Sequence, residues 1–184
     1  MDYIFTHSQC VTETHCLNES YKKTGIKALI SPQEEAGMII VRTLDYLPNE
    51  KSAIASYDLE EKIENDDIYL LSLTWCIEKR NGNSKSKLGY KSIEANNARS
   101  DLFETMGIES ALSHNGSGYT MEKRSAIIQR LDRVITLSNV FEFRGQIVVK
   151  DSEKFLNVYY NGHGNKKGFG FGMPFIKYIG ATID

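Results

Sequence analysis

Residues 139–179 read NVFEFRGQIVVK, DSEKFLNVYYN and GHGNKKGFGFGMPFIKYI, and this stretch constrains the fold more tightly than any other part of the 184-residue chain. Its first part alternates apolar with polar side chains and predicts a strand, in which Gly145 marks a bulge or a close backbone approach. Asp151 or Ser152 then caps a helix that ends at Gly162. The predicted order is strand, helix, glycine-rich loop and strand.

The residues before this stretch predict another strand and helix. IYLLSLTWCI (68–77) places Tyr69, Leu71, Leu73, Trp75 and Ile77 on one face. Residues 92–106 have apolar residues at helical spacing, with Gly107 as the stop. The form of MEKRSAIIQRLDR (121–133) is uncertain. The strand aromatics are predicted to be core residues rather than base-stacking platforms; they are Tyr69, Trp75, Phe141 and Phe143.

The N-terminal part predicts a smaller unit of the same class. A strand at 3–5 precedes a helix at 9–24 that Gly25 ends, and strands follow at 26–31 and 37–47. The last of these alternates Met38, Ile40, Leu44 and Tyr46 with Arg42, Thr43 and Asp45. Residues 49–64 have room for a second helix and a weak edge strand. This order, βαββαβ, is the ferredoxin-like arrangement.

The predicted fold is therefore α+β, with two tandem ferredoxin-like (RRM-like) modules and a C-terminal glycine-rich loop. The modules span residues 1–64 and 65–184. The chain contains no internal sequence repeat, so any symmetry between the modules would exist only in structure.

Charge is unevenly distributed along the chain. The net charge is −2, but residues 1–78 carry −8 (6 basic, 14 acidic) and residues 79–184 carry +6 (16 basic, 10 acidic). A polyanion-binding surface would therefore belong to the C-terminal half. KRNGNSKSKLGYK (79–91) has no acidic residue and predicts a mobile cationic loop that contacts RNA phosphates or is simply solvated. For Lys123, Arg124, Arg130 and Arg133 the alternative to RNA contact is a solvated helix face.

The cysteines and histidines indicate neither a disulfide framework nor a metal site. Cys10, Cys16 and Cys76 lack CxxC spacing, and His7, His15, His114 and His163 share no ligand motif. We expect free thiols, no metal and no cofactor. No stretch is long and apolar enough for a membrane span or a secretory signal, so a soluble cytoplasmic protein is expected.

The glycine-rich loop is a candidate phosphate site. Between Gly162 and Gly172 it combines five glycines with Lys166 and Lys167, so backbone N–H groups and positive charge can approach an anion. A turn that serves only tight packing is the alternative. Nucleotide-cofactor binding is disfavoured, because the loop runs from a helix into a strand and contains no GKS or GKT.

The same loop resembles that of the CRISPR RNA endoribonucleases of type I-E Cascade complexes (CasE-like, RAMP superfamily), whose form is GxGxxKxxGxG before an apolar strand. Gly162, Gly164, Lys167, Gly170 and Gly172 occupy its fixed positions. VFEFRGQIVVKD is similar to the family's VxFxGxLxVxD strand. The strand at 68–77 and the basic segment after it are similar to the region LRFRLRANPxK, although most of its letters differ.

The resemblance implies metal-independent cleavage of a CRISPR repeat RNA hairpin, with the mature crRNA retained among other Cascade-type subunits and no membrane association. His15 occupies the position of a catalytic histidine on the family's first helix, and Lys167 would stabilise charge on the phosphate. Thr12 stands where the family often has tyrosine, so the second catalytic group is open among Tyr21, Tyr3 and Lys22. His7 is a rival to His15, and His15 as an exposed residue without a role is the alternative.

The predicted RNA-binding residues lie in three segments: Lys79, Arg80, Lys85, Lys87, Lys91, Lys123, Arg124, Gly162, Gly164, Lys166, Gly168 and Gly170. A non-catalytic RNA-binding subunit of the same fold is the second hypothesis. The third is a small transferase that uses the loop for a phosphate-bearing cofactor, which a lack of stabilisation by nucleotides or coenzyme A would remove.

Overall fold

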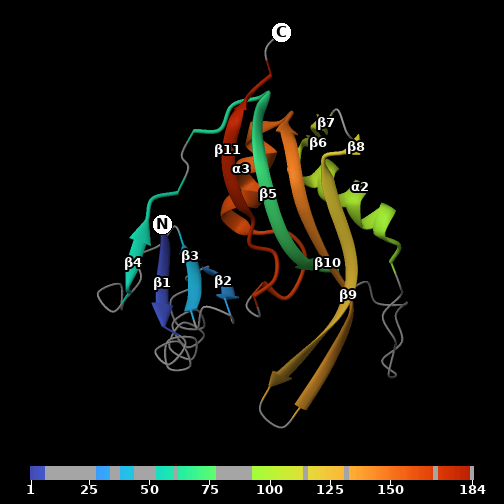
Figure 1. Ribbon diagram of the computed structural model, residues 1–184. Coiled ribbons are helices and arrows are strands. Elements are labelled where there is room, and N and C mark those ends of the chain that lie inside the picture. Colours follow the sequence, from blue (N-terminus) through green and yellow to red (C-terminus); the bar gives the residue numbers. More distant parts are fainter. Residues whose placement is uncertain are drawn as a thin grey trace.

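The computed structural model describes residues 1–6, 28–33, 38–43, 53–59, 62–77, 93–113, 116–130, 133–167 and 170–182. Within these ranges the chain forms a smaller N-terminal sheet and a larger C-terminal sheet with helices against it (Figure 1). The prediction of a mixed helix-and-strand fold is confirmed.

The N-terminal sheet consists of β1 (Asp2–Thr6), β2 (Ala28–Gln33), β3 (Met38–Thr43) and β4 (Ala55–Tyr57). Its order is β2-β3-β1-β4, and each neighbouring pair is antiparallel. Within the described residues these strands overlap the predicted ones, and β4 is the short edge strand expected between 49 and 64; Leu44, Asp45 and Tyr46 of the predicted third strand lie outside the described residues. The helix predicted at 9–24 lies outside the described residues.

The C-terminal sheet is built from β5 (Asp67–Cys76), β6 (Ile108–Ser110), β9 (Tyr119–Arg130), β10 (Arg133–Val149) and β11 (Phe175–Ala181). Its order is β11-β5-β10-β6, and β9 also pairs with β10. A small hairpin of β7 (Leu112–Ser113) and β8 (Gly116–Ser117) lies between β6 and β9.

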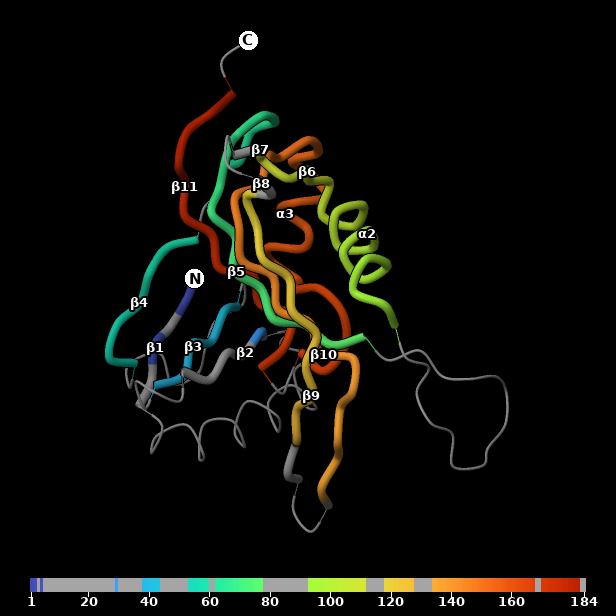
Figure 2. Tube along the Cα trace, turned by 45° about the vertical axis from the view of Figure 1, so that its right-hand side comes forward, coloured from blue at the N-terminus to red at the C-terminus, as the bar shows by residue number. Residues whose placement is uncertain are grey.

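Two helices cover one face of this sheet, α2 (Ala95–Met106) and α3 (Ser152–Asn161) (Figure 2). The predicted helix ends are confirmed: Gly107 ends α2 in the left-handed conformation (φ 63°), and Asp151 caps α3 by accepting a hydrogen bond from the Lys154 N–H at 3.0 Å. That hydrogen bond lowers the pKa of Asp151 below its ordinary value.

The core lies between the helices and the inner face of the sheet. As predicted, the aromatic strand residues are buried there rather than available to stack on bases; the principal members are Tyr69, Leu71, Leu73, Trp75, Leu102, Met106, Phe141, Phe143, Ile147 and Phe155. Gly145 makes the predicted close approach, since a Cβ there would lie 2.2 Å from the Tyr119 Cβ. The register shift in β10 falls elsewhere, between Leu137 and Val140.

Two sequence interpretations need correction. Residues 119–130 form β9, which makes a hairpin with β10 that projects beyond the rest of the sheet (Figures 1 and 2), so Lys123 and Arg124 do not lie on a helix face. In β3, burial does not follow the apolar alternation: Ile39, Val41 and also Arg42 and Thr43 are buried. A charged residue is buried at low cost only where partners compensate it, and Arg42 has such partners.

Candidate nucleic-acid interface

The glycine-rich loop folds back on itself and is bonded to the end of β5. The His163 N–H donates to the Gly172 carbonyl at 2.9 Å, which closes the loop. The Asn165 N–H donates to the Cys76 carbonyl and the Gly172 N–H to the Thr74 carbonyl, each at 2.7 Å. The loop therefore has a defined place beside the last residues of β5, after α3 and before β11.

The glycines are required by this packing. Gly164 and Gly172 have φ values of 74° and 86°, and a Cβ would lie 2.6 Å from the Cys76 oxygen and 2.1 Å from the His163 oxygen respectively. The N–H groups of Gly162 and Gly170 donate to the carbonyls of Val158 and Lys167. Several N–H groups expected to face a phosphate thus already have acceptors in the protein, and the lysines supply the loop's positive charge.

The two loop lysines are fixed differently. Lys166 has a left-handed backbone, with φ 60°. The Lys167 ammonium donates to the carbonyl of Asn161, the last residue of α3, at 2.7 Å. A cation at this position is favoured by the negative end of the helix dipole. Lys167 is thus held at the start of the loop, whereas its predicted partner His15 lies outside the described residues.

His163 is the second residue of the loop, and its side chain is buried, only 5% exposed. Its ring makes an edge contact with Trp75, with centroids 5.7 Å apart, and its Nε2 lies 3.7 Å from Asp101 Oδ2. Burial lowers the pKa of His163 to about 4. The negative charge of Asp101 opposes this decrease in pKa, and the positive charge of Lys167 adds to it. The imidazole is therefore neutral at pH 7 and packs as a core group.

The residues that flank the predicted basic residues 79–91, Ile77 and Ile93, are both bonded to one buried residue. Asn139 on β10 is 2% exposed; its carbonyl accepts from the Ile77 N–H at 3.0 Å, and its side-chain Oδ1 accepts from the Ile93 N–H at 3.1 Å. The basic residues themselves lie outside the described residues, namely Lys79, Arg80, Lys85, Lys87 and Lys91, as does Gly168 of the loop.

Lys123 and Arg124 are neighbours on β9 that face opposite sides of the sheet. The Lys123 ammonium donates to the carbonyl of Ile93 at 2.8 Å and lies 5.9 Å from the Phe141 ring, on the helix side. Arg124 lies on the face that the helices leave open, in register with Val140 of β10. Of the two predicted residues, Arg124 is the one placed to meet a ligand on the open face.

Arg124 shares a carboxylate with an arginine that the sequence did not single out. Glu142 is largely buried and forms ion pairs with Arg124 and with Arg144, the latter at 2.7 Å. The two arginine side chains remain 52% and 68% exposed. Glu122 lies opposite Glu142, so the group is not strongly cationic overall. Its effect is to orient two exposed guanidinium groups, each suited to a phosphate.

The glycine-rich loop, the β9–β10 hairpin and the two residues that flank the basic segment, Ile77 and Ile93, therefore meet at one end of the C-terminal sheet. The glycine-rich loop is bonded to Thr74 and Cys76, and the flanks of the basic segment are bonded to Asn139. Phe171 of the loop packs with Cys76, Val140 and Leu137, beside the β9–β10 hairpin. Within the described ranges, no three His, Cys, Asp or Glu side chains gather as metal ligands would.

A family model described as "CRISPR associated protein" matches residues 82–177, more than half of the chain. The chain belongs to this CRISPR-associated family. The match begins within the basic segment, covers the β9–β10 hairpin and the glycine-rich loop, and ends in β11. No curated protein matches the sequence. No helix in the described part of this CRISPR-associated chain has the length and apolar character to cross a bilayer.

Solved structures of other CRISPR proteins share the fold at low identity. Cse3 of Thermus thermophilus, bound to an RNA representing a pre-cleavage complex, is 16% identical, with a TM-score of 0.66 over 93% of this chain and 88% of that one. The CRISPR endoribonuclease Cse3 bound to 19 nt RNA is 15% identical, with a TM-score of 0.66 over 93% of this chain and 89% of that one. The CRISPR-associated protein Cas6e from Escherichia coli str. K-12 is 10% identical, with a TM-score of 0.63 over 95% of this chain and 96% of that one.

Proposed function

We propose that this chain is an endoribonuclease that binds a CRISPR repeat RNA hairpin, cleaves it to mature crRNA and stays bound to the product as a Cascade-type subunit. The observation that carries the proposal is that the glycine-rich loop, the β9–β10 hairpin and the residues flanking the basic segment meet at Cys76 and Asn139. Family membership and the fold shared with Cse3 and Cas6e support the same reading.

The proposed RNA interface recognises shape and backbone charge. A-form RNA has a deep and narrow major groove, so proteins contact its phosphates and its accessible edges more than its paired bases. The exposed arginines Arg124 and Arg144 lie on the open face, and the charge of residues 79–184 is +6. These groups supply the counterion-releasing contacts that RNA binding requires.

The proposed reaction needs no metal ion. The ribose 2′-OH loses its proton and attacks the adjacent phosphorus, the bond to the 5′ oxygen breaks, and that oxygen gains a proton. The products are a 2′,3′-cyclic phosphate and a free 5′-OH. His15 would transfer a proton, and Lys167 would stabilise the charge on the phosphorane. The ammonium of Lys167 is held beside the end of α3, so its position is defined before RNA binds.

We also propose that the chain consists of two ferredoxin-like modules, 1–64 and 65–184. The support is the equivalent order of the two sheets: β2-β3-β1-β4 in the first, and β11-β5-β10 followed by β6 and β9 in the second, with β5, β10 and β11 taking the places of β1, β3 and β4. The second module places α2 and α3 in the two crossovers of that arrangement.

A non-catalytic RNA-binding subunit is the second candidate, favoured by Thr12 in place of the family's tyrosine. One experiment separates the two: a labelled CRISPR-repeat hairpin is incubated with wild type and His15→Ala in EDTA. Cutting at the stem base with a 2′,3′-cyclic end, lost in the variant, supports the enzyme. Tight binding without cutting in either protein indicates a binding subunit, and absence of binding overturns both.

A further inference from the structure

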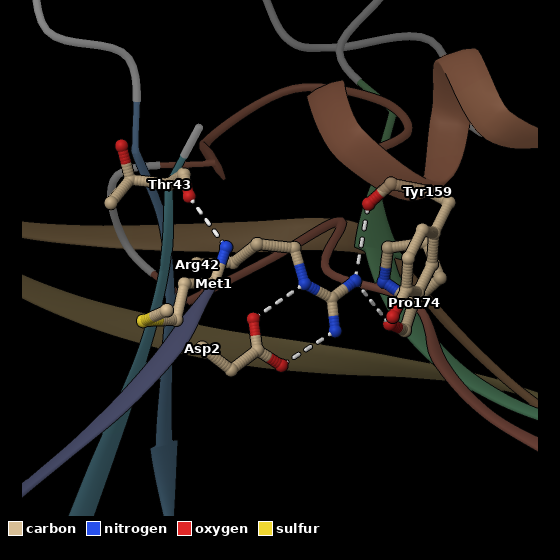
Figure 3. A network of polar contacts seen from close by, with 6 residues as sticks. All are labelled: Met1, Asp2, Arg42, Thr43, Tyr159 and Pro174. Atoms are coloured by element: carbon tan, nitrogen blue, oxygen red, sulfur yellow. Dashed lines mark hydrogen bonds and ion pairs between the residues drawn. The ribbon is translucent and has the colours of Figure 1, made fainter. Parts of the chain in front are cut away.

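Arg42 of β3 is a buried cation, 3% exposed, whose guanidinium bonds in two directions (Figure 3). Its Nε and Nη2 donate to the two carboxylate oxygens of Asp2 on β1, each at 2.8 Å. Its Nη1 donates to the backbone carbonyls of Tyr159 at 3.1 Å and Pro174 at 2.8 Å. The guanidinium also lies over the Tyr159 ring, 4.2 Å from its centroid.

The two carbonyls lie at the two ends of the glycine-rich loop. Tyr159 is in the last turn of α3, before Gly162, and Pro174 follows Gly172 and immediately precedes β11. One guanidinium nitrogen therefore binds the residue that leads into the loop and the residue that leads out of it. Leu29 of β2 adds an apolar contact, since a Cβ on Gly162 would meet its Cδ2 at 2.7 Å.

The opposite side of Arg42 is fixed to the strand that precedes the predicted catalytic histidine. Asp2 belongs to β1, and the chain continues from Thr6 at its end into the segment that contains His15. Arginine suits this role because its planar fork holds a carboxylate in two parallel bonds while a third nitrogen remains for other acceptors. A buried ion pair is weak evidence for a contribution to stability, so the bonds of Arg42 are better explained by a positional role.

We infer that Arg42 is a positioning residue that fixes the N-terminal sheet against both ends of the glycine-rich loop, and so sets Lys166 and Lys167 relative to β1, the strand that precedes His15 in the sequence. The role in RNA cleavage rests on the proposed function. The mechanical part, one side chain holding both ends of the loop, is independent of it.

Hydrogen exchange of the full-length protein tests both parts. Arg42→Met keeps an unbranched stem of similar reach and removes all the guanidinium donors. In the free protein, exchange in the peptide containing His163, Asn165 and Gly172 should accelerate at least about tenfold, whereas peptides from the β5–β10 pairing should not change. In wild type, a CRISPR-repeat hairpin should slow exchange of the same loop peptide, and in the variant it should do so less.

Cleavage kinetics supply a readout that lost stability alone does not move. At saturating hairpin the single-turnover rate of Arg42→Met should fall about tenfold to a hundredfold, because small misplacements of catalytic groups have effects of that size. The dissociation constant should change less than about threefold, since the basic segment and the arginines remain. Arg42→Lys, which retains a cation but no fork, should recover part of the rate.

Two further variants keep the test decisive. If Arg42→Met does not fold, the double variant Asp2→Asn/Arg42→Met is used in its place, because it also removes the carboxylate that the single variant leaves unpaired. Ile147→Ala lowers stability in the core, away from the loop, and should change neither loop exchange nor the rate at saturation. Unchanged loop exchange in the Arg42 variants overturns the inference, as does an equal effect of Ile147→Ala. No protection of the wild-type loop by RNA would instead overturn the proposed function.

Discussion

The side-chain oxygen of Asn139 accepts a hydrogen bond from the backbone N–H of Ile93 at 3.1 Å, across 46 residues of sequence. Since the Asn139 carbonyl also accepts from Ile77, one residue holds both ends of the segment with the basic residues 79–91. Asn139 lies at the register shift of β10, where the β9–β10 hairpin leaves the sheet. The arrangement ties two of the three proposed RNA-binding segments to a single point.

Asn139→Leu should therefore weaken RNA binding without altering any charge. The variant keeps a side chain branched at Cγ, although a larger one, and leaves the Ile93 N–H without its acceptor, a loss of about 1–3 kcal/mol in the free energy of unfolding. We expect a weaker dissociation constant for hairpin RNA, measured by filter binding, and a lower midpoint in urea. Ser138→Ala, at the exposed neighbouring position, is the control. Equal affinities for Asn139→Leu and wild type would show that this anchor does not organise the interface.

Arg124→Gln and Arg144→Gln should each reduce the salt dependence of RNA binding. A phosphate contact contributes about one to the slope of log K against log salt, and each variant removes one such contact. Stability should change by less than about 1 kcal/mol, because both side chains are exposed and Glu142 keeps one arginine in each variant. Lys62→Gln, which removes an exposed cation paired with Glu64, should leave the slope unchanged. A slope insensitive to both arginine substitutions would remove the open face from the proposed interface.

The two loop lysines should separate binding from catalysis. Lys166→Gln and Lys167→Gln should each flatten the salt slope by about one. Only Lys167→Gln should also lower the cleavage rate at saturating RNA, because its ammonium is the proposed electrostatic catalyst. Lys167→Gln should also lower the free energy of unfolding by about 0.5 kcal/mol, because it removes a cation from the C-terminus of α3. Lys154→Gln on α3 is the matched control, and equal rates for all three variants would exclude Lys167 from the reaction.

His163 should make the protein sensitive to mild acid. Its folded pKa of about 4 lies below the ordinary value of 6.5, so the unfolded chain binds a proton first as the pH falls. The associated stability is fully present above about pH 6.5 and is lost towards pH 4, to a limit of about 3 kcal/mol. His163→Phe keeps a ring against Trp75 and lacks the proton. Urea midpoints at pH 7, 5.5 and 4.5 should fall less steeply in the variant, whereas parallel curves would show that other groups control acid unfolding.

Sequence patterns predicted the parts of this fold that depend on local periodicity. Apolar alternation located β5 and β10 and their buried faces, and the caps at Gly107 and Asp151 followed from ordinary helix-end chemistry. The hairpin at 119–130 was missed because MEKRSAIIQR mixes charges and apolar residues without a clear period of either two or 3.6. Pairing with β10 decides its conformation.

The polar anchors could not be predicted because their partners are remote in sequence. Arg42 bonds to carbonyls 117 and 132 residues away, and nothing local distinguishes it from an arginine on the polar side of a strand. Arg144 is a similar case, since it is a single basic residue in a largely apolar strand and its partnership with Glu142 and Arg124 depends on the pairing of β9 with β10. The alternation of side chains along a strand does place Arg144 and Glu142 on the face opposite Phe141 and Phe143, so the ion pair between them could have been predicted from the strand.

The glycines of the loop provide a comparison within one chain. Gly172 has a φ of 86°, and a methyl group there would lie 2.1 Å from the His163 carbonyl oxygen, which is a steric clash. Nothing lies within 4 Å of the corresponding position at Gly180 on β11. Gly172→Ala should therefore lower the free energy of unfolding by at least about 1–3 kcal/mol, because backbone strain and the clash add. Gly180→Ala should be neutral or stabilising by up to about 1 kcal/mol, as expected for glycine in a strand.

The same pair tests whether loop closure matters for the interface. Gly172→Ala disrupts the His163–Gly172 and Gly172–Thr74 hydrogen bonds that seat the loop on β5, so Lys166 and Lys167 should no longer be held near the end of that strand. RNA affinity and its salt slope should both fall in Gly172→Ala and stay at wild-type values in Gly180→Ala, measured at a temperature where both proteins are folded. A destabilised Gly172→Ala that binds RNA like wild type would mean that the glycines serve packing alone and that the phosphate contacts lie on the sheet and the basic segment.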